Sequence, residues 1–374
     1  MKDLLLITPP FTQLNTPYPA TAYLKGFLNT KNISSYQIDL GIEVILEIFS
    51  KKGVTEIFNV KPKNLSENAH RIFALREEYI KTIDEVIAFL QNKKPTLARQ
   101  ICSMNFLPEA SRFNQLDDME YAFGNMGLQD KAKHLATLYL EDLSDYIVEN
   151  IDENFGFSRY AERLGRSANS FDELYEKLQS EKTFVDNFTV EILDKKLLET
   201  KPKLVCFSVP FPGNLYSAFR CAQYIKNHYP KIKTAFGGGF ANTELRDLKD
   251  KRVFEFFDFI TLDDGELPIE LLFENICHFE QSEESLFKRT FLLENGEVVY
   301  KNNSERHDYK QAEIGTPDYT DLPLDQYISV IEIANPMHSL WSDGRWNKLT
   351  MAHGCYWGKC TFCDISLDYI KIYE

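Results

Sequence analysis

Short apolar runs that end in glycine- or proline-rich turns limit the fold of this chain more than any other feature. They occur at residues 4–7, 204–209, 234–236 and 259–262, and helical spacing of apolar residues follows three of them. A continuous apolar run suits a strand that is buried on both faces, as in a parallel sheet. The repetition predicts an α/β fold with a Rossmann-like, doubly wound parallel sheet and right-handed crossovers.

Two segments depart from this alternation. Between residues 66 and 200 glycine is sparse and long helical patterns dominate, whereas residues 291–300 alternate around Asn295-Gly296, a strong hairpin signal. Four segments are therefore expected: a Rossmann-like domain from residues 1–60 and 201–285, a helical insertion at 61–200, a linker with a β-hairpin at 286–346, and a final segment at 347–374.

The charge of the chain limits its partners. The formal net charge is −14, and no local basic stripe offsets it, so a nucleic-acid backbone would be repelled. No apolar run approaches the length of a membrane span, and the opening residues are too short for a secretion signal. We therefore expect a cytoplasmic protein that binds neither nucleic acid nor membrane.

Three of the seven cysteines lie together in the segment 354–364, which reads GCYWGKCTFCD. The other four are scattered through apolar or helical contexts, where a small buried side chain is the usual role. An odd number without regular spacing argues against a disulfide framework. Three thiolates within nine residues can surround one metal centre, and three ligands on a four-iron cluster leave one iron open to a further molecule.

This segment resembles the cluster loop of radical S-adenosylmethionine enzymes. Four residues separate its first two cysteines instead of the usual three, which matches the form found in cobalamin-binding members. The resemblance implies that Cys355, Cys360 and Cys363 hold a [4Fe–4S] cluster, that S-adenosylmethionine binds its open iron, and that Phe362 is the aromatic residue before the last ligand. It further implies a small-molecule or peptide substrate and an electron donor such as flavodoxin or ferredoxin.

The resemblance extends upstream over most of the chain outside the helical insertion, beginning with residues 4–10 and 19–24. It implies a cobalamin-type cofactor site at Ser208, Gly237, Gly238, Gly239, Gly265 and Glu266. A tight turn explains three consecutive glycines equally well, and a helix cap explains an acidic cluster such as 263–266. The chain lacks the Asp-x-His-x-x-Gly motif of proteins that ligate cobalamin through histidine, so cobalamin remains a candidate that would bind without such a ligand.

The last segment is expected to form the first strand, at residues 348–352, and the cluster loop of an incomplete β/α barrel. Only 11 residues follow Cys363, too few for a barrel, so turnover is expected only in a complete form, from a longer chain or with a second polypeptide. Two alternatives stay open. One is a non-catalytic module that binds cobalamin or another nucleotide-like ligand, and the other is a zinc-stabilised interaction protein in which His353 is a fourth ligand.

Overall fold

A seven-stranded sheet organises the computed structural model, which describes residues 2–62, 65–103, 105–115, 127–166, 170–277, 285–331, 348–350, 352, 354–359, 367 and 370. Its strand order is β2-β1-β3-β4-β5-β6-β7, and the first five strands are parallel. The expected α/β fold with a mostly parallel sheet is therefore confirmed. The strands are β1 (Leu4–Thr8), β2 (Ser35–Asp39), β3 (Leu204–Ser208), β4 (Lys233–Gly237), β5 (Phe259–Thr261), β6 (Thr290–Glu294) and β7 (Glu297–Lys301).

Helices cover both faces of the sheet. In β1, Leu4 and Leu6 pack with α1 (Ala20–Thr30) and α14 (Glu266–Cys277), whereas Leu5 and Ile7 belong to the larger cluster with α2 (Leu40–Ile48), α11 (Phe184–Thr200) and α12 (Leu215–His228). Because successive side chains of a strand point to opposite faces, a strand covered on both sides must be apolar throughout. This explains the continuous apolar runs in the sequence.

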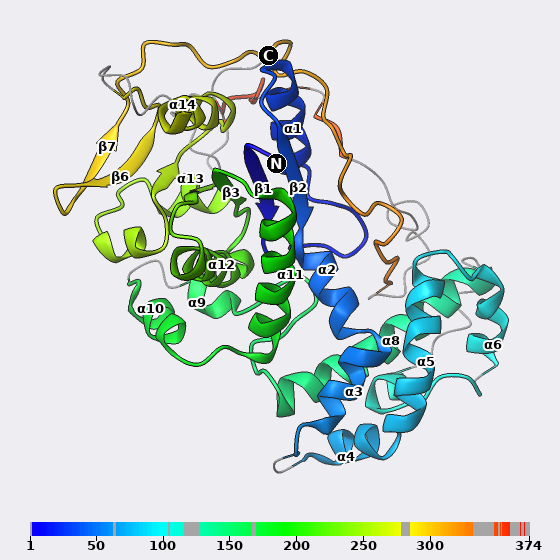
Figure 1. Cartoon of the computed structure of the whole chain (residues 1–374). Coiled ribbons are helices and arrows are strands. Elements are labelled where there is room, and N and C mark those ends of the chain that lie inside the picture. Colours follow the sequence, from blue (N-terminus) through cyan, green and yellow to red (C-terminus); the bar gives the residue numbers. More distant parts are fainter. Residues whose placement is uncertain are drawn as a thin grey trace.

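The predicted hairpin is part of this sheet. Asn295 and Gly296 both have positive φ angles, of 52° and 80°, and form the turn between β6 and β7. β6 runs antiparallel beside β5, with Phe291 opposite Ile260. The hairpin, which was expected within a linker, thus pairs the edge of β5 that would otherwise be open. It lies at the outer edge of the sheet, far from the helical stretch (Figure 1).

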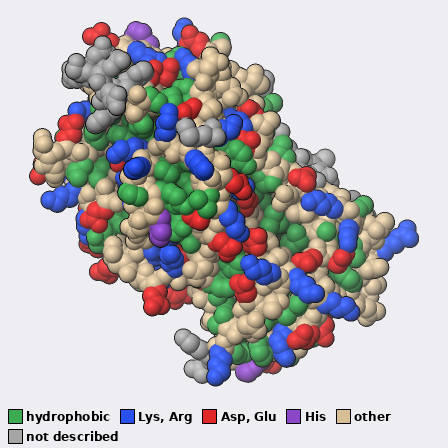
Figure 2. Space-filling model, viewed as in Figure 1, with side chains coloured by type: hydrophobic (Ala, Val, Ile, Leu, Met, Phe, Trp, Pro, Cys, Tyr) green, Lys and Arg blue, Asp and Glu red, His purple; other side chains and the backbone are tan. Residues whose placement is uncertain are grey.

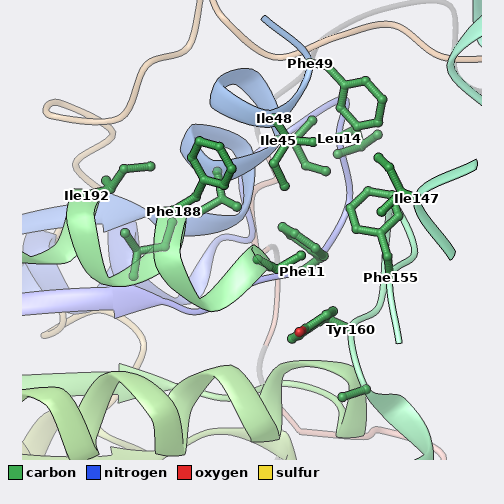
Figure 3. Packing of buried hydrophobic residues seen from close by; sticks show 14 of the residues in the cluster. Phe11, Leu14, Ile45, Ile48, Phe49, Ile147, Phe155, Tyr160, Phe188 and Ile192 are labelled. Atoms are coloured by element: carbon green, nitrogen blue, oxygen red, sulfur yellow. The ribbon is translucent and has the colours of Figure 1, made fainter. Parts of the chain in front are cut away.

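The helical stretch lies at one end of the sheet, beyond α2 (Figure 1). It does not have a separate core, because one continuous apolar cluster joins it to the sheet. Figure 3 shows Phe11 and Leu14, from the loop after β1, among Phe49 and Phe155; the ring centroids of Phe11 and Phe155 are 5.9 Å apart. Its helices are α3 (Lys51–Asn59), α4 (Glu67–Ala74), α5 (Arg76–Leu90), α6 (Ala98–Cys102) and α8 (Gly127–Asn150). The next two helices, α9 (Glu162–Arg166) and α10 (Asp172–Gln179), lie instead beside α12 (Figure 1).

A connector at residues 316–331 follows the hairpin and ties α1 and β2 to the helical stretch. Gln37 in β2 donates through Nε2 to the carbonyl oxygen of Asp318 at 2.6 Å. Tyr327 donates its hydroxyl to Asp39 at 2.8 Å, and the N–H of Ile331 donates to the Thr137 hydroxyl in α8 at 2.9 Å. The connector is therefore held along its length by buried hydrogen bonds rather than lying free.

Asp39 makes the stability of this arrangement depend on pH. Burial raises the pKa of its carboxyl group to about 6, although hydrogen bonds from Tyr327 and two backbone N–H groups favour the charged form. A folded pKa above the unfolded value means that stability is present at low pH and is lost as the pH rises through about 6. We expect the unfolding free energy to fall between about pH 5 and 7.5, and to fall less in Asp39→Asn. Urea titrations at both pH values measure the unfolding free energy. An equal change with pH in the wild type and in Asp39→Asn would contradict this prediction.

Charged side chains of both signs are interspersed over the face shown in Figure 2. Among the helices that the structure describes, none is both long and apolar enough to cross a membrane.

Candidate functional site

A cavity of about 290 Å³ opens at the carboxyl ends of β3, β4 and β5, next to the first turns of α1 and α14. Small side chains leave this space open above the sheet. They belong to the sheet face toward α1 and α14, at Cys206, Ser208, Ala235 and Gly237. Ligands of open α/β sheets bind at this edge. The cavity is lined by Leu6, Tyr18, Pro19, Ala20, Thr21, Tyr23, Leu24, Cys206, Phe207, Ser208, Ala235, Phe236, Gly237, Gly238, Thr261, Asp263, Asp264, Gly265, Glu266, Ile269, Gln311, Ile314 and Thr350.

The structure brings most of the predicted cofactor residues to this one cavity, although they come from three different strand ends. Gly239 is the exception, because it does not line the cavity. A Cβ atom on Gly239 would lie 2.7 Å from the carbonyl oxygen of Pro210. Close packing against the end of β3 therefore explains this glycine. The five predicted residues that do line the cavity are Ser208, Gly237, Gly238, Gly265 and Glu266.

Gly238 is required by the backbone. Its φ is +105° and its ψ is −173°, a combination open to almost no residue but glycine, and a Cβ there would lie 2.8 Å from the carbonyl oxygen of Val209. Gly237 differs, because the nearest atom to its Cβ would be the hydroxyl of Thr261, at 2.8 Å, another residue of the cavity wall. The turn interpretation thus holds for Gly238, whereas Gly237 leaves room in the cavity.

We expect Gly238→Ala to lower the unfolding free energy by about 3 kcal/mol, because strained backbone and a steric clash act together. Gly296→Ala is the matched control. Gly296 also has a positive φ, of +80°, but nothing lies within 4 Å of its added Cβ, so the loss there should be about 1 kcal/mol. Urea denaturation measures both values. Equal losses would show that the contact with Val209 is relieved at no cost.

Two hydroxyl groups of the cavity wall have no protein partner in the part of the chain that the structure describes. Ser208 is 7% exposed and makes no side-chain hydrogen bond there. The Oγ1 atom of Thr21, a residue only 1% exposed, also has no partner and, unlike that of Ser208, is itself fully buried. A buried hydroxyl without a hydrogen bond costs free energy, whereas the accessible hydroxyl of Ser208 can bond to an incoming ligand. The sequence identified Ser208 as a site residue, whereas Thr21 was not among the predicted site residues.

The acidic cluster on the opposite wall is largely held by the protein. Asp263 pairs with Arg246 and, at 3.6 Å, with Arg289. Arg289 also donates to the carbonyl oxygen of Asp264 at 3.2 Å. Glu266 is the first residue of α14, where a carboxylate is favoured by the helix dipole. The helix-cap and turn interpretation therefore accounts for Asp263 and Glu266 without a ligand.

The segment that leads to the cysteine loop forms part of the cavity wall. Thr350 lines the cavity, and its N–H donates to the hydroxyl of Tyr23 in α1 at 2.5 Å. Lys348 is held by Tyr319, whose hydroxyl donates to the Lys348 carbonyl oxygen at 2.6 Å. The described residues 348–350 and 352 are not in a strand, so the barrel strand expected at 348–352 is not confirmed.

Of the predicted cluster ligands, only Cys355 belongs to the described residues. It is half-buried, and its N–H donates to the carbonyl oxygen of Ile370 at 2.9 Å. Cys360, Phe362, Cys363 and His353 lie outside the described residues, so the predicted ligand set is untested. Within the described ranges, no three His, Cys, Asp or Glu side chains are grouped so as to hold a metal ion.

Comparisons with protein-family models, with curated proteins and with solved structures find no significant match. The resemblance of the cysteine loop to a known family therefore stays a prediction.

Proposed function

We propose that this chain is the cofactor-binding part of a cobalamin-type radical S-adenosylmethionine enzyme. The observation that carries the proposal is Thr350, which lies in the wall of the cavity and five residues before Cys355. A ligand in the cavity and a cluster in the cysteine loop would therefore be neighbours. An enzyme that combines two cofactors needs this proximity.

The cavity suits a ligand with a flat, apolar group and a polar arm. Its floor is formed by small side chains, and Ser208, whose side chain makes no hydrogen bond to the described residues, lies on its wall. The parallel strand order β2-β1-β3-β4-β5 places a switch point between β1 and β3, and Leu6 and Cys206 from these strands both line the cavity. No histidine is among the lining residues that the structure describes.

Cys355, Cys360 and Cys363 would hold the iron–sulfur cluster. When bound, the cluster supplies the electron for reductive cleavage of S-adenosylmethionine. The chain's own contribution is to hold the start of the loop in place: Tyr23 and Tyr319 bind the backbone at Thr350 and Lys348, and Ile370 binds the backbone at Cys355. Tyr356 and Trp357, the two residues after Cys355, are exposed.

Anaerobic reconstitution with iron and sulfide tests the proposal. We expect about four irons and four sulfides per chain, a visible absorption band that dithionite bleaches, and retention of hydroxocobalamin on gel filtration. One zinc ion without sulfide would instead identify a zinc-stabilised interaction protein. A colourless protein that retains cobalamin would identify a non-catalytic binding module.

A further inference from the structure

The two edge strands of the sheet differ in how they are covered. β2 is almost fully buried, and the connector lies against it, with Nε2 of Gln37 donating to the carbonyl oxygens of Asp318 and Thr320. β7 is half-buried to exposed along its whole length and, among the described residues, pairs with β6 alone. It lies at the outer edge of the molecule (Figure 1). An open edge strand is a template for a further strand.

The outward-facing backbone groups of β7 belong to Val298 and Tyr300. On the other side of β6, the N–H of Leu262 donates to the carbonyl oxygen of Arg289, and the bonding direction of an antiparallel strand alternates with each residue. The even-numbered residues of β6 therefore bond to β7, so Val299 faces β6 and its two neighbours face outward. Outside the β6–β7 ladder, no backbone hydrogen bond between described residues reaches Val298 or Tyr300.

The sequence of β7 favours pairing instead of preventing it. Residues 297–301 read EVVYK, with β-branched and aromatic residues at the centre and charges only at the two ends. The strand has no proline, and its register with β6 is continuous, without a bulge. Proline, bulges and central charges are the usual devices that keep an edge strand from pairing.

The strand is also complementary to a second copy of itself. In an antiparallel pair of copies centred on Val299, Glu297 of each copy lies opposite Lys301 of the other. Val298 of each copy lies opposite Tyr300 of the other, a β-branched residue against an aromatic one. These are the two residues with outward-facing backbone groups, so each Val298–Tyr300 pair can exchange two hydrogen bonds.

Glu297 lacks a cation in the single chain. It lies opposite Glu294 across the hairpin, and like charges opposite each other destabilise a strand pair. Among the described residues, Lys301 pairs with Glu294 and not with Glu297. Lys301 of a second copy supplies the missing opposite charge.

The apolar side chains of the hairpin continue across the same pair of copies. Tyr300 lies opposite Phe291, with ring centroids 4.9 Å apart, and Val298 lies opposite Leu293. Tyr300 of one copy would therefore lie between its own Phe291 and Val298 of the other copy. Leu293 and Tyr300 are 42% and 47% exposed in the single chain, and this row covers part of that apolar surface.

We propose that two copies of this chain associate through β7, in an antiparallel pair centred on Val299 that joins their two sheets into one. The association goes beyond the proposed function and needs no cofactor. The interface is confined to a strand edge and the side chains beside it. It is therefore small, and the dimer is weak and depends on concentration.

Sedimentation velocity of the full chain between about 2 and 200 µM measures the association. The sedimentation coefficient should rise with concentration from that of one chain toward that of two. Glu297→Lys and Lys301→Glu should each weaken association roughly tenfold or more, because each change places like charges opposite each other twice. An equimolar mixture of these two variants should restore association, since every charge pair between them is again of opposite sign.

Two further variants serve as a control and as a test of the backbone pairing. Glu305→Lys makes the same charge change at an exposed residue beyond β7 and should leave association unchanged. Val298→Pro removes an outward-facing N–H that the hairpin itself does not use, so it should abolish the dimer while the hairpin remains. Circular dichroism and the thermal midpoint show whether each variant is folded.

Each outcome decides the proposal. Dimerisation that the two charge variants weaken and their mixture restores supports it. A single chain at every concentration overturns it and leaves the edge of β7 to another partner. A dimer that Glu297→Lys and Val298→Pro both leave intact also overturns it, as does a mixture of the charge variants that stays monomeric while the wild type dimerises.

Discussion

Replacing Arg220 with methionine is expected to lower the unfolding free energy by about 3–5 kcal/mol, because it leaves a buried carboxylate without its partner. Arg220 and Asp186 are 3% and 1% exposed, and the Nε of Arg220 lies 3.0 Å from Oδ2 of Asp186. Asp186 also accepts a hydrogen bond from Tyr216 at 2.8 Å and completes the capping box of α11 with Thr183. This network holds α11 to α12 on one face of the sheet.

The loss should depend on pH. Burial raises the pKa of Asp186, and Arg220 opposes that rise, so the arginine's removal raises the pKa further. A carboxyl whose folded pKa is raised loses its stability contribution as the pH rises through that pKa. The variant should therefore lose the most unfolding free energy, relative to the wild type, at neutral pH. The loss should become smaller as the pH falls and Asp186 becomes protonated.

Urea titrations at about pH 7.5 and pH 5.5 measure both effects. The double variant Arg220→Met, Asp186→Asn should regain most of the loss at neutral pH, since no buried charge remains. Arg252→Met is the control: Arg252 pairs with Asp250 at 2.6 Å but is more exposed, so its removal should cost less than about 1 kcal/mol. Similar losses for the Arg220 and Arg252 variants would contradict the role given to burial.

The second large effect is expected on iron content. Replacing Cys355, Cys360 or Cys363 singly with alanine should reduce the iron bound after reconstitution from about four atoms per chain to less than one. A four-iron cluster with one open iron needs three cysteine ligands, and each variant would leave only two of them. Iron and acid-labile sulfide analysis, with the visible spectrum, measures the loss.

Cys277→Ala is the matched control, because Cys277 is an exposed free cysteine at the end of α14, outside the predicted loop. Its iron content should equal that of the wild type. If the Cys277 variant lost as much iron as the loop variants, the iron would be bound to thiols without selectivity, and the cluster assignment would have to be abandoned.

Local pattern alone predicted the strands and the helices that flank them. Residues 4–7 and 204–209 became β1 and β3, and Asn295-Gly296 became the turn of the hairpin. These predictions succeeded because the alternation of strand side chains and the positive φ of a tight turn are properties of neighbouring residues. The placement of the hairpin against β5 was not predicted, since pairing depends on which strand edge remains open.

Glycine at 237, 238 and 239 shows what the sequence could not separate. All three follow one strand, yet Gly239 packs on Pro210, Gly238 needs its backbone angles, and Gly237 leaves space in the cavity. Each role depends on an atom from another element. The same holds for Thr21, whose hydroxyl lacks a partner because of how α1 packs over the sheet.

The sequence by itself determined the alternation of strands and helices and the cysteine spacing on which the functional proposal rests, because both are encoded within short stretches of chain. Only the tertiary structure decided that Ser208, Gly237, Gly265 and Thr350 meet at one cavity. These residues are separated by long intervals in the chain. Parallel strand pairing and the burial of apolar side chains bring their strand ends to a common edge, where small side chains leave the space open.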